Sequence, residues 1–132
     1  MKLFVVLLGA LCAIVPVSFC TDLVAEEIFA RGTEWKFLEG RKEASSPDVT
    51  AWRQVDFDDA SWVLGQTPLF YGEPLFGTEL PDMRGSYSSV FLRKKFVVEN
   101  LSEISHLLLE AVSDDGFIAW INGREVARYN VA

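Results

Sequence analysis

Residues suited to holding a small ligand occur in two parts of this sequence, a long irregular loop and a segment near the C-terminal end. Trp120 presents a flat indole, which would stack on the apolar face of a sugar ring if it stood on the outer face of its strand. Asp114 and Asp115 have carboxylates that could ligate calcium or accept hydrogen bonds from sugar hydroxyls. Tyr71 lies in the loop, the kind of segment that often carries function. Trp120, Asp114, Asp115 and Tyr71 are therefore the candidate ligand-binding residues.

Each candidate also has a purely structural role to be weighed against binding. Trp120 becomes a core residue if the loop 67–86 covers it. Turn chemistry explains Asp114-Asp115 without a ligand, because Asp side chains accept hydrogen bonds from backbone amides two residues on. Trp35, Trp52 and Trp62 lie in segments with an apolar pattern, so we expect them in the core.

Catalytic constellations have little support in the sequence. His106 is the only histidine. The sequence therefore shows no set of ligands for a zinc site and no partner for a nucleophile activated by that histidine. A glycosidase needs two carboxyls about 5 to 9.5 Å apart that converge on one bond, whereas adjacent aspartates in a turn tend to diverge. We expect no enzyme activity, no metal site and no cofactor, with a structural calcium at the aspartates as the one alternative.

Residues 1–20 are typical of a secretory signal peptide. Lys2 supplies the positive start, Leu3 to Val17 is an apolar run, and small residues lead to an expected cleavage after Cys20. Lipoprotein processing at that cysteine is an alternative, although Phe19 is not the small residue that such processing requires. As a transmembrane span the run is too short. The predicted location is secreted or at the cell surface, after a short lead-in over residues 21–27.

The expected mature chain is acidic and has no cysteine. One of the 12 basic residues and none of the 19 acidic ones lies in residues 1–20, so the remaining 112 residues carry a formal charge of −8. Such a charge argues against nucleic acid and against an anionic membrane surface as partners. Both cysteines, Cys12 and Cys20, lie in the leader, so the domain would depend on its core rather than on a disulfide.

The segment from Ser105 to Arg128 predicts an antiparallel meander of strands. Leu107 to Val112 alternates with the two-residue period of a strand, and the turn Asp114-Asp115-Gly116 ends it. Phe117 to Ile121 forms the next strand. Asn122-Gly123 then favours a type I′ hairpin, from which Arg124 to Arg128 returns.

The preceding chain predicts further short strands separated by turns. Strands are expected at 28–30, 33–38 and 88–98, and a short extended segment at 52–57. A helical turn capped by Asp58 or Asp59 should place Trp62 in the core and end at Gly65. Residues 67–86, rich in Pro and Gly, are expected to be an irregular loop.

Four motifs in this order resemble galactose-binding-like jelly-roll domains of secreted multidomain bacterial proteins, which are related to carbohydrate-binding modules. The resemblance covers about Trp35 to Asn130 and rests on FDDASW at 57–62, PLFYG at 68–72, VFLRKKF at 90–96 and DDGFIAWINGREVARYN at 114–130. It implies an all-β fold, an antiparallel β-sandwich of eight or more strands. Phe70 departs from the second motif. The pattern would continue beyond Ala132, so the sandwich over residues 28–132 is expected to be incomplete at its C-terminus.

The resemblance favours a secreted, non-catalytic module that binds carbohydrate as an accessory to other domains of a longer parent chain. One alternative is a structural or protein-interaction domain of a larger surface protein. Another is the N-terminal fragment of a secreted hydrolase whose catalytic domain is missing. Fold by itself does not decide among them.

Overall fold

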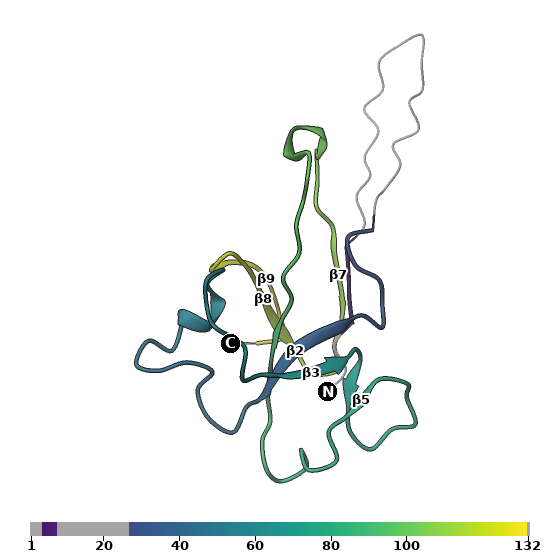
Figure 1. Cartoon of the computed structure of the whole chain (residues 1–132). Coiled ribbons are helices and arrows are strands. Elements are labelled where there is room, and N and C mark those ends of the chain that lie inside the picture. Colours follow the sequence, from purple (N-terminus) through teal and green to yellow (C-terminus); the bar gives the residue numbers. More distant parts are fainter. Residues whose placement is uncertain (1–3, 8–26, 132) are drawn as a thin grey trace.

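The chain folds almost entirely into short strands. A computed structural model describes residues 4–7 and 27–131, and Figure 1 shows its strands as a twisted, open arrangement from which one long connection projects. Two single turns of 3-10 helix, η1 (Ala51–Arg53) and η2 (Leu101–Glu103), are the helical elements of the described residues. The strands are β1 (Phe4–Leu7), β2 (Glu34–Glu39), β3 (Val63–Gln66), β4 (Leu69–Phe70), β5 (Thr78–Glu79), β6 (Val90–Arg93), β7 (Leu109–Val112), β8 (Phe117–Ile121) and β9 (Arg124–Tyr129).

These strands form four small sheets, which confirms the predicted all-β class at a coarse level. The largest has the order β3-β2-β6, and β1 with β7 and β8 with β9 form separate antiparallel pairs. The pair of β4 and β5 is parallel. Within the described ranges, no helix is long and apolar enough to cross a membrane.

β2 is the central strand, and its alternating side chains separate two cores. Phe37 is 5% exposed and packs with Leu69, Leu80, Met83 and Tyr87. Its neighbour Leu38 points to the opposite face, because side chains alternate along a strand. There it packs against a second cluster, which consists of Ala44, Trp52 and Trp62 with the partly buried Phe57, Phe91 and Trp120 around it. The predicted strand at 33–38 is thus confirmed to within one residue at each end.

The segment before β3 buries Trp62 as expected, but it is not a helical turn. Asp58 accepts a hydrogen bond at Oδ1 from the amide of Ala60 at 2.9 Å, and the Trp62 amide donates to the Asp59 carbonyl at 3.0 Å. Trp62 is then 5% exposed. The expectation that Gly65 ends a helix is wrong. Gly65 lies inside β3, where a Cβ would come within 2.7 Å of the Phe37 ring, so the missing side chain makes room for that ring.

The loop over residues 67–86 contributes much of the first core, contrary to its irregular pattern. β4 and β5 lie within it, and the amide of Leu80 donates to the Phe70 carbonyl at 2.7 Å. Leu69 is 1% exposed and Met83 is 4% exposed. The loop is therefore a packed layer over one face of β2.

One predicted strand does not form, two others were too long, and the meander is wrong in its pairing. Ile28 to Ala30 forms no strand, the expected strand at 88–98 extends only over β6, and that at 107–112 only over β7. β7 pairs with β1, not with β8. A turn separates them, in which the Ser113 hydroxyl donates to the Gly116 carbonyl at 3.0 Å. The Asn130 side chain donates from Nδ2 to the backbone carbonyl of Asp115, which fixes this turn to the end of β9.

The hairpin of β8 and β9 confirms the Asn122-Gly123 prediction. Both turn residues have positive φ, 50° at Asn122 and 80° at Gly123, as a type I′ turn requires. A side chain on Gly123 would also meet Gln54, whose Nε2 lies 2.6 Å from the position of a Cβ. The turn is therefore restricted by backbone conformation and by packing.

Gly123→Val should lower the thermal unfolding midpoint. A β-branched residue at positive φ is strained by about 1 to 3 kcal/mol, before any displacement of Gln54. Thermal denaturation followed by circular dichroism measures the effect. Asn122→Gly, which accepts positive φ without a side chain, is the control and should leave the hairpin intact. A midpoint for Gly123→Val equal to that of the wild type would show that the turn tolerates a side chain.

Candidate functional site

Trp120 is half-buried and contributes to the second core. Its ring lies edge-on to Trp52, with 5.3 Å between centroids and an interplanar angle of 77°. The guanidinium carbon of Arg53 lies 4.4 Å from the centroid of the Trp120 ring, in a cation–π arrangement. The covering residues come from η1, whereas the sequence suggested loop 67–86. The ring face beneath Arg53 is consequently not open to a sugar.

The hairpin of β8 and β9 is irregular next to Trp120. Its register shifts between Ala119 and Trp120, so that Ala119 lies opposite Ala127 and Trp120 opposite Glu125. The extra residue of this bulge is Val126, which lies in β9, so the two-residue period of β8 continues through Trp120. The outward position of Trp120 was considered on the assumption that the other face of β8 meets the core, whereas η1 covers the face that carries Trp120.

Tyr71 and Asp115 come together in a small open cleft of about 210 Å³. Tyr71 follows β4 and Asp115 belongs to the turn before β8, so the fold brings two distant candidates to one place. Asp114 is exposed and does not line this cleft. The remaining lining residues are Met83, Arg84, Gly85, Tyr87 and Ser88.

The wall formed by Tyr87 is held by an ion network at the end of β2. Arg41 donates from Nε to Glu39 Oε2 at 2.6 Å and from its other nitrogens to Ser86 and Asp82. Its guanidinium carbon lies 4.6 Å from the centroid of the Tyr87 ring. The Tyr87 hydroxyl donates to Asp82 Oδ1 at 3.2 Å. The loop carrying Arg84 and Ser88 is thereby fixed to the central sheet.

Burial, followed by the nearby carboxylates of Glu39 and Asp82, raises the pKa of Tyr87 to about 12. The phenol, which is protonated at neutral pH even with the ordinary tyrosine pKa of about 10, thus keeps its proton and its hydrogen bond to Asp82 to still higher pH. Because this hydroxyl is already engaged, Tyr87 offers mainly its ring to the cleft. The groups with polar atoms toward solvent are Arg84, Ser88 and Asp115, all of which are exposed.

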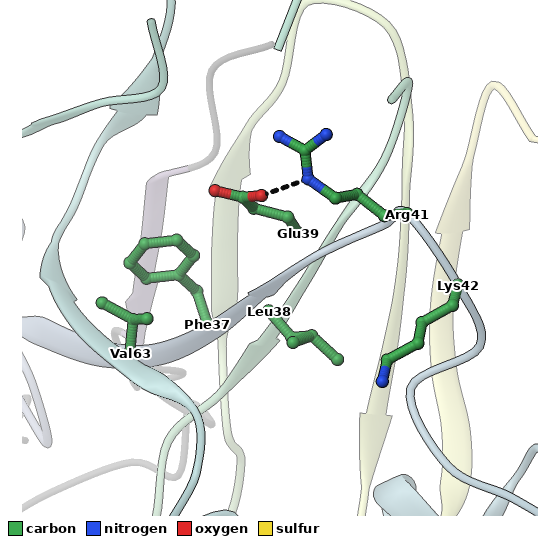
Figure 2. A pocket seen from close by; sticks show the side chains of 6 residues that line it. All are labelled: Phe37, Leu38, Glu39, Arg41, Lys42 and Val63. Atoms are coloured by element: carbon green, nitrogen blue, oxygen red, sulfur yellow. Dashed lines mark hydrogen bonds and ion pairs between the residues drawn. The ribbon is translucent and has the colours of Figure 1, made fainter. Parts of the chain in front are cut away.

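A larger open hollow of about 390 Å³ lies beside the end of β2 (Figure 2). Phe37, Leu38 and Val63 form its apolar part, and Glu39 and Arg41 are paired with one another at its edge. None of the candidates from the sequence lines it. Because this hollow contains none of the candidate residues and its Glu39 carboxylate is already paired with Arg41, we centre the site on the smaller cleft.

Sequence reasoning missed five residues of the cleft, of which Arg84 and Ser88 have exposed polar side chains. Their signal was their position in loop 67–86 and the segment after it, next to Gly85, which has a φ of 76° and shapes the turn. His106 is exposed and does not line the cleft. Among residues 4–7 and 27–131, no group of three or more His, Cys, Asp or Glu side chains is placed to hold a metal ion.

Comparison with known proteins adds no relative. No protein-family model, no curated protein and no solved structure matches this chain.

Proposed function

We propose that this protein is a secreted, non-catalytic β-sandwich module of the galactose-binding-like jelly-roll kind, which binds carbohydrate as an accessory domain. The observation that carries the proposal is the meeting of Tyr71 and Asp115 in one cleft. The two residues are chosen independently from the sequence, one for its loop and one for its turn. Their convergence is what a shared ligand would require.

The chemistry of the cleft suits a sugar with neighbouring hydroxyls. A hydroxyl both donates and accepts, so it can donate to the Asp115 carboxylate and accept from the Arg84 guanidinium. The exposed ring of Tyr71 supplies an apolar surface for the C–H face of the sugar. The volume of about 210 Å³ is below the roughly 300 to 1,000 Å³ of drug-sized sites. We therefore expect recognition of one sugar unit, with weak affinity.

Tyr71→Ala and Asp115→Asn should each weaken glycan binding about 10-fold, the equivalent of one stacking contact or one charged hydrogen bond. A glycan array identifies the ligand, and affinity electrophoresis of the full-length secreted protein in a gel containing it measures the change. Phe76→Ala is the matched control, since Phe76 is an aromatic loop residue that is 99% exposed and does not line the cleft. Failure of the wild type to bind any glycan, or equal binding by the Tyr71→Ala variant, would refute the proposal.

A second candidate, a protein-interaction domain of a larger surface protein, is favoured by exposed apolar side chains outside the cleft. Val97 is 83% exposed and Leu101 is 74% exposed, both in the connection that projects from the sheets, and Tyr129 at the end of β9 is 58% exposed (Figure 1). Surface of this kind commonly marks contact with protein. Glycan binding that depends on Tyr71 separates the first candidate from the second.

A further inference from the structure

β7 presents a strand edge that is occupied by the N-terminal end of the same chain. Phe4–Leu7 pairs with Leu109–Val112 in antiparallel register, from Phe4 opposite Val112 to Leu7 opposite Leu109. No other strand of the described residues pairs with β7. The expected signal peptide includes Phe4–Leu7, so the residues that complete this sheet are ones that export would remove.

We propose that β7 is an acceptor for an extended apolar strand, and that the leader residues Phe4–Leu7 fill it in the uncleaved precursor. The pairing itself does not depend on export; only its loss on maturation rests on the secretion proposed above. Strand addition of this kind gains its affinity from main-chain hydrogen bonds. The leader supplies the sequence FVVL, rich in the residues that favour strands.

A second contact brings the N-terminal part of the chain to β7. Arg31 donates to the Glu110 carboxylate at 2.9 Å, and Glu110 lies opposite Val6 in the β1–β7 pair. Both side chains are about half exposed, at 56% and 50%, so the ion pair contributes orientation more than stability. It fixes the chain after the leader next to the strand that the leader occupies.

Cleavage after Cys20 would leave β7 without a ladder partner. Three apolar residues on or directly before β7 are exposed, Leu107 at 45%, Leu108 at 51% and Val112 at 40%. An unpaired edge with such side chains is ready to pair with another strand. Docking also has a consequence for the precursor. While Phe4–Leu7 are paired with β7, the leader is withheld from the export machinery.

Hydrogen exchange of the full chain, synthesised without export so that the leader is retained, tests the docking. Val5→Pro with Val6→Pro is the disrupting variant, and Val5→Thr with Val6→Thr is the matched control that keeps both amides. Amides of consecutive strand residues point to opposite edges, so replacing both removes a donor toward β7 whichever residue supplies it. We expect exchange over Leu109–Val112 to be about 10-fold faster in the proline variant and in a chain beginning at Thr21. Exchange over Phe117–Ile121 in β8 serves as the folding control and should not change.

A peptide of residues 3–8, flanked by lysines for solubility, provides a test that does not depend on folding of the proline variant. Added to the chain beginning at Thr21, it should restore slow exchange over Leu109–Val112. Equal exchange at β7 in all chains, or no effect of the peptide, would overturn the proposal. Protection in the chain beginning at Thr21 that rises with its concentration would overturn it as well, because a second copy rather than the leader would then fill the edge. Glycan binding at the Tyr71 cleft is measured separately, so either proposal can fail without affecting the test of the other.

Discussion

Replacement of Arg93 by Met should lower the free energy of unfolding by about 3 kcal/mol, the lower end of the range for breaking a buried ion pair. Arg93 donates from Nε to Asp59 Oδ2 at 2.9 Å, and the two side chains are only 9% and 14% exposed. Its Nη1 also donates to the backbone carbonyls of Trp52 and Gln54. The substitution keeps much of the apolar length of the side chain but leaves a poorly solvated carboxylate and two carbonyls without this donor.

Chemical denaturation at pH 7 measures this change, with Arg128→Met as the matched control. Arg128 pairs with Glu125 through the same kind of contact, Nε to carboxylate at 2.8 Å, but on the surface, where its side chain is 38% exposed. Surface pairs contribute little, so the control should unfold close to the wild type. Equal destabilisation by the two substitutions would show that burial of the Arg93–Asp59 pair does not increase its contribution to the free energy of unfolding.

The same pair predicts a dependence of stability on pH. The hydrogen bond from Arg93 lowers the pKa of Asp59 below its ordinary value. The unfolded chain therefore binds the proton more readily, with a pKa of about 3.9. The contribution of the pair is present above that pKa and is lost as the pH falls through the lower pKa of the folded state. This part of the acid sensitivity should be absent from Arg93→Met.

The parts of the fold that follow from local sequence were predicted well. The alternating residues of β2 and the turns on either side of it lie within a few positions of one another, and the β8–β9 hairpin is specified by Asn122-Gly123. Both elements can be recognised from local sequence, because a strand period and a positive φ are properties of neighbouring residues. Burial of Trp62 belongs to the same group, although the chain reaches it by a turn stabilised by Asp58 instead of a helix.

The parts that depend on distant partners were not predictable in this way. The many Pro and Gly residues of loop 67–86 predict an irregular loop. They do not predict the burial of Leu69 and Met83, which depends on the contact of these residues with Phe37 of β2. β7 has a strand pattern, yet nothing local distinguishes pairing with β8 from pairing with residues more than 100 positions earlier. Pairing over such separations is decided by the whole fold.

Two of the seven residues that line the candidate cleft were recognisable from residue type and position. Tyr71 and Asp115 were selected for chemistry suited to loops and turns, and the fold places both at the cleft. Arg84 was not selected although it lies next to Gly85 in the loop, because a single arginine in a loop is usually a solvated residue. The sequence left Trp120 open between an outer and a covered position, because the residues of η1 that cover it are distant in the sequence.

Trp52 is the residue whose loss should disturb the second core most. Its ring centroid lies 5.2 Å from that of Phe91, 5.3 Å from that of Trp120 and 6.2 Å from that of Trp62, and it is 7% exposed. It therefore links β6, β8 and the turn before β3, which do not all belong to one sheet. Removing it takes away an aromatic contact that joins Trp120 of the β8–β9 hairpin to Phe91 of the central sheet.

Trp52→Ala should reduce the free energy of unfolding by about 3 to 5 kcal/mol, the usual cost of truncating a buried aromatic residue. Where the variant remains folded, acrylamide quenching of its tryptophan fluorescence should increase, because Trp120 loses the ring that covers its edge. Trp35→Ala is the control. Trp35 is half-buried against Phe29, 5.4 Å away between centroids, and lies outside this cluster, so its loss should destabilise less and leave Trp120 protected. If Trp52→Ala unfolds at the wild-type denaturant midpoint, the hairpin is not anchored through Trp52, and the burial of Trp120 must depend on Arg53 instead.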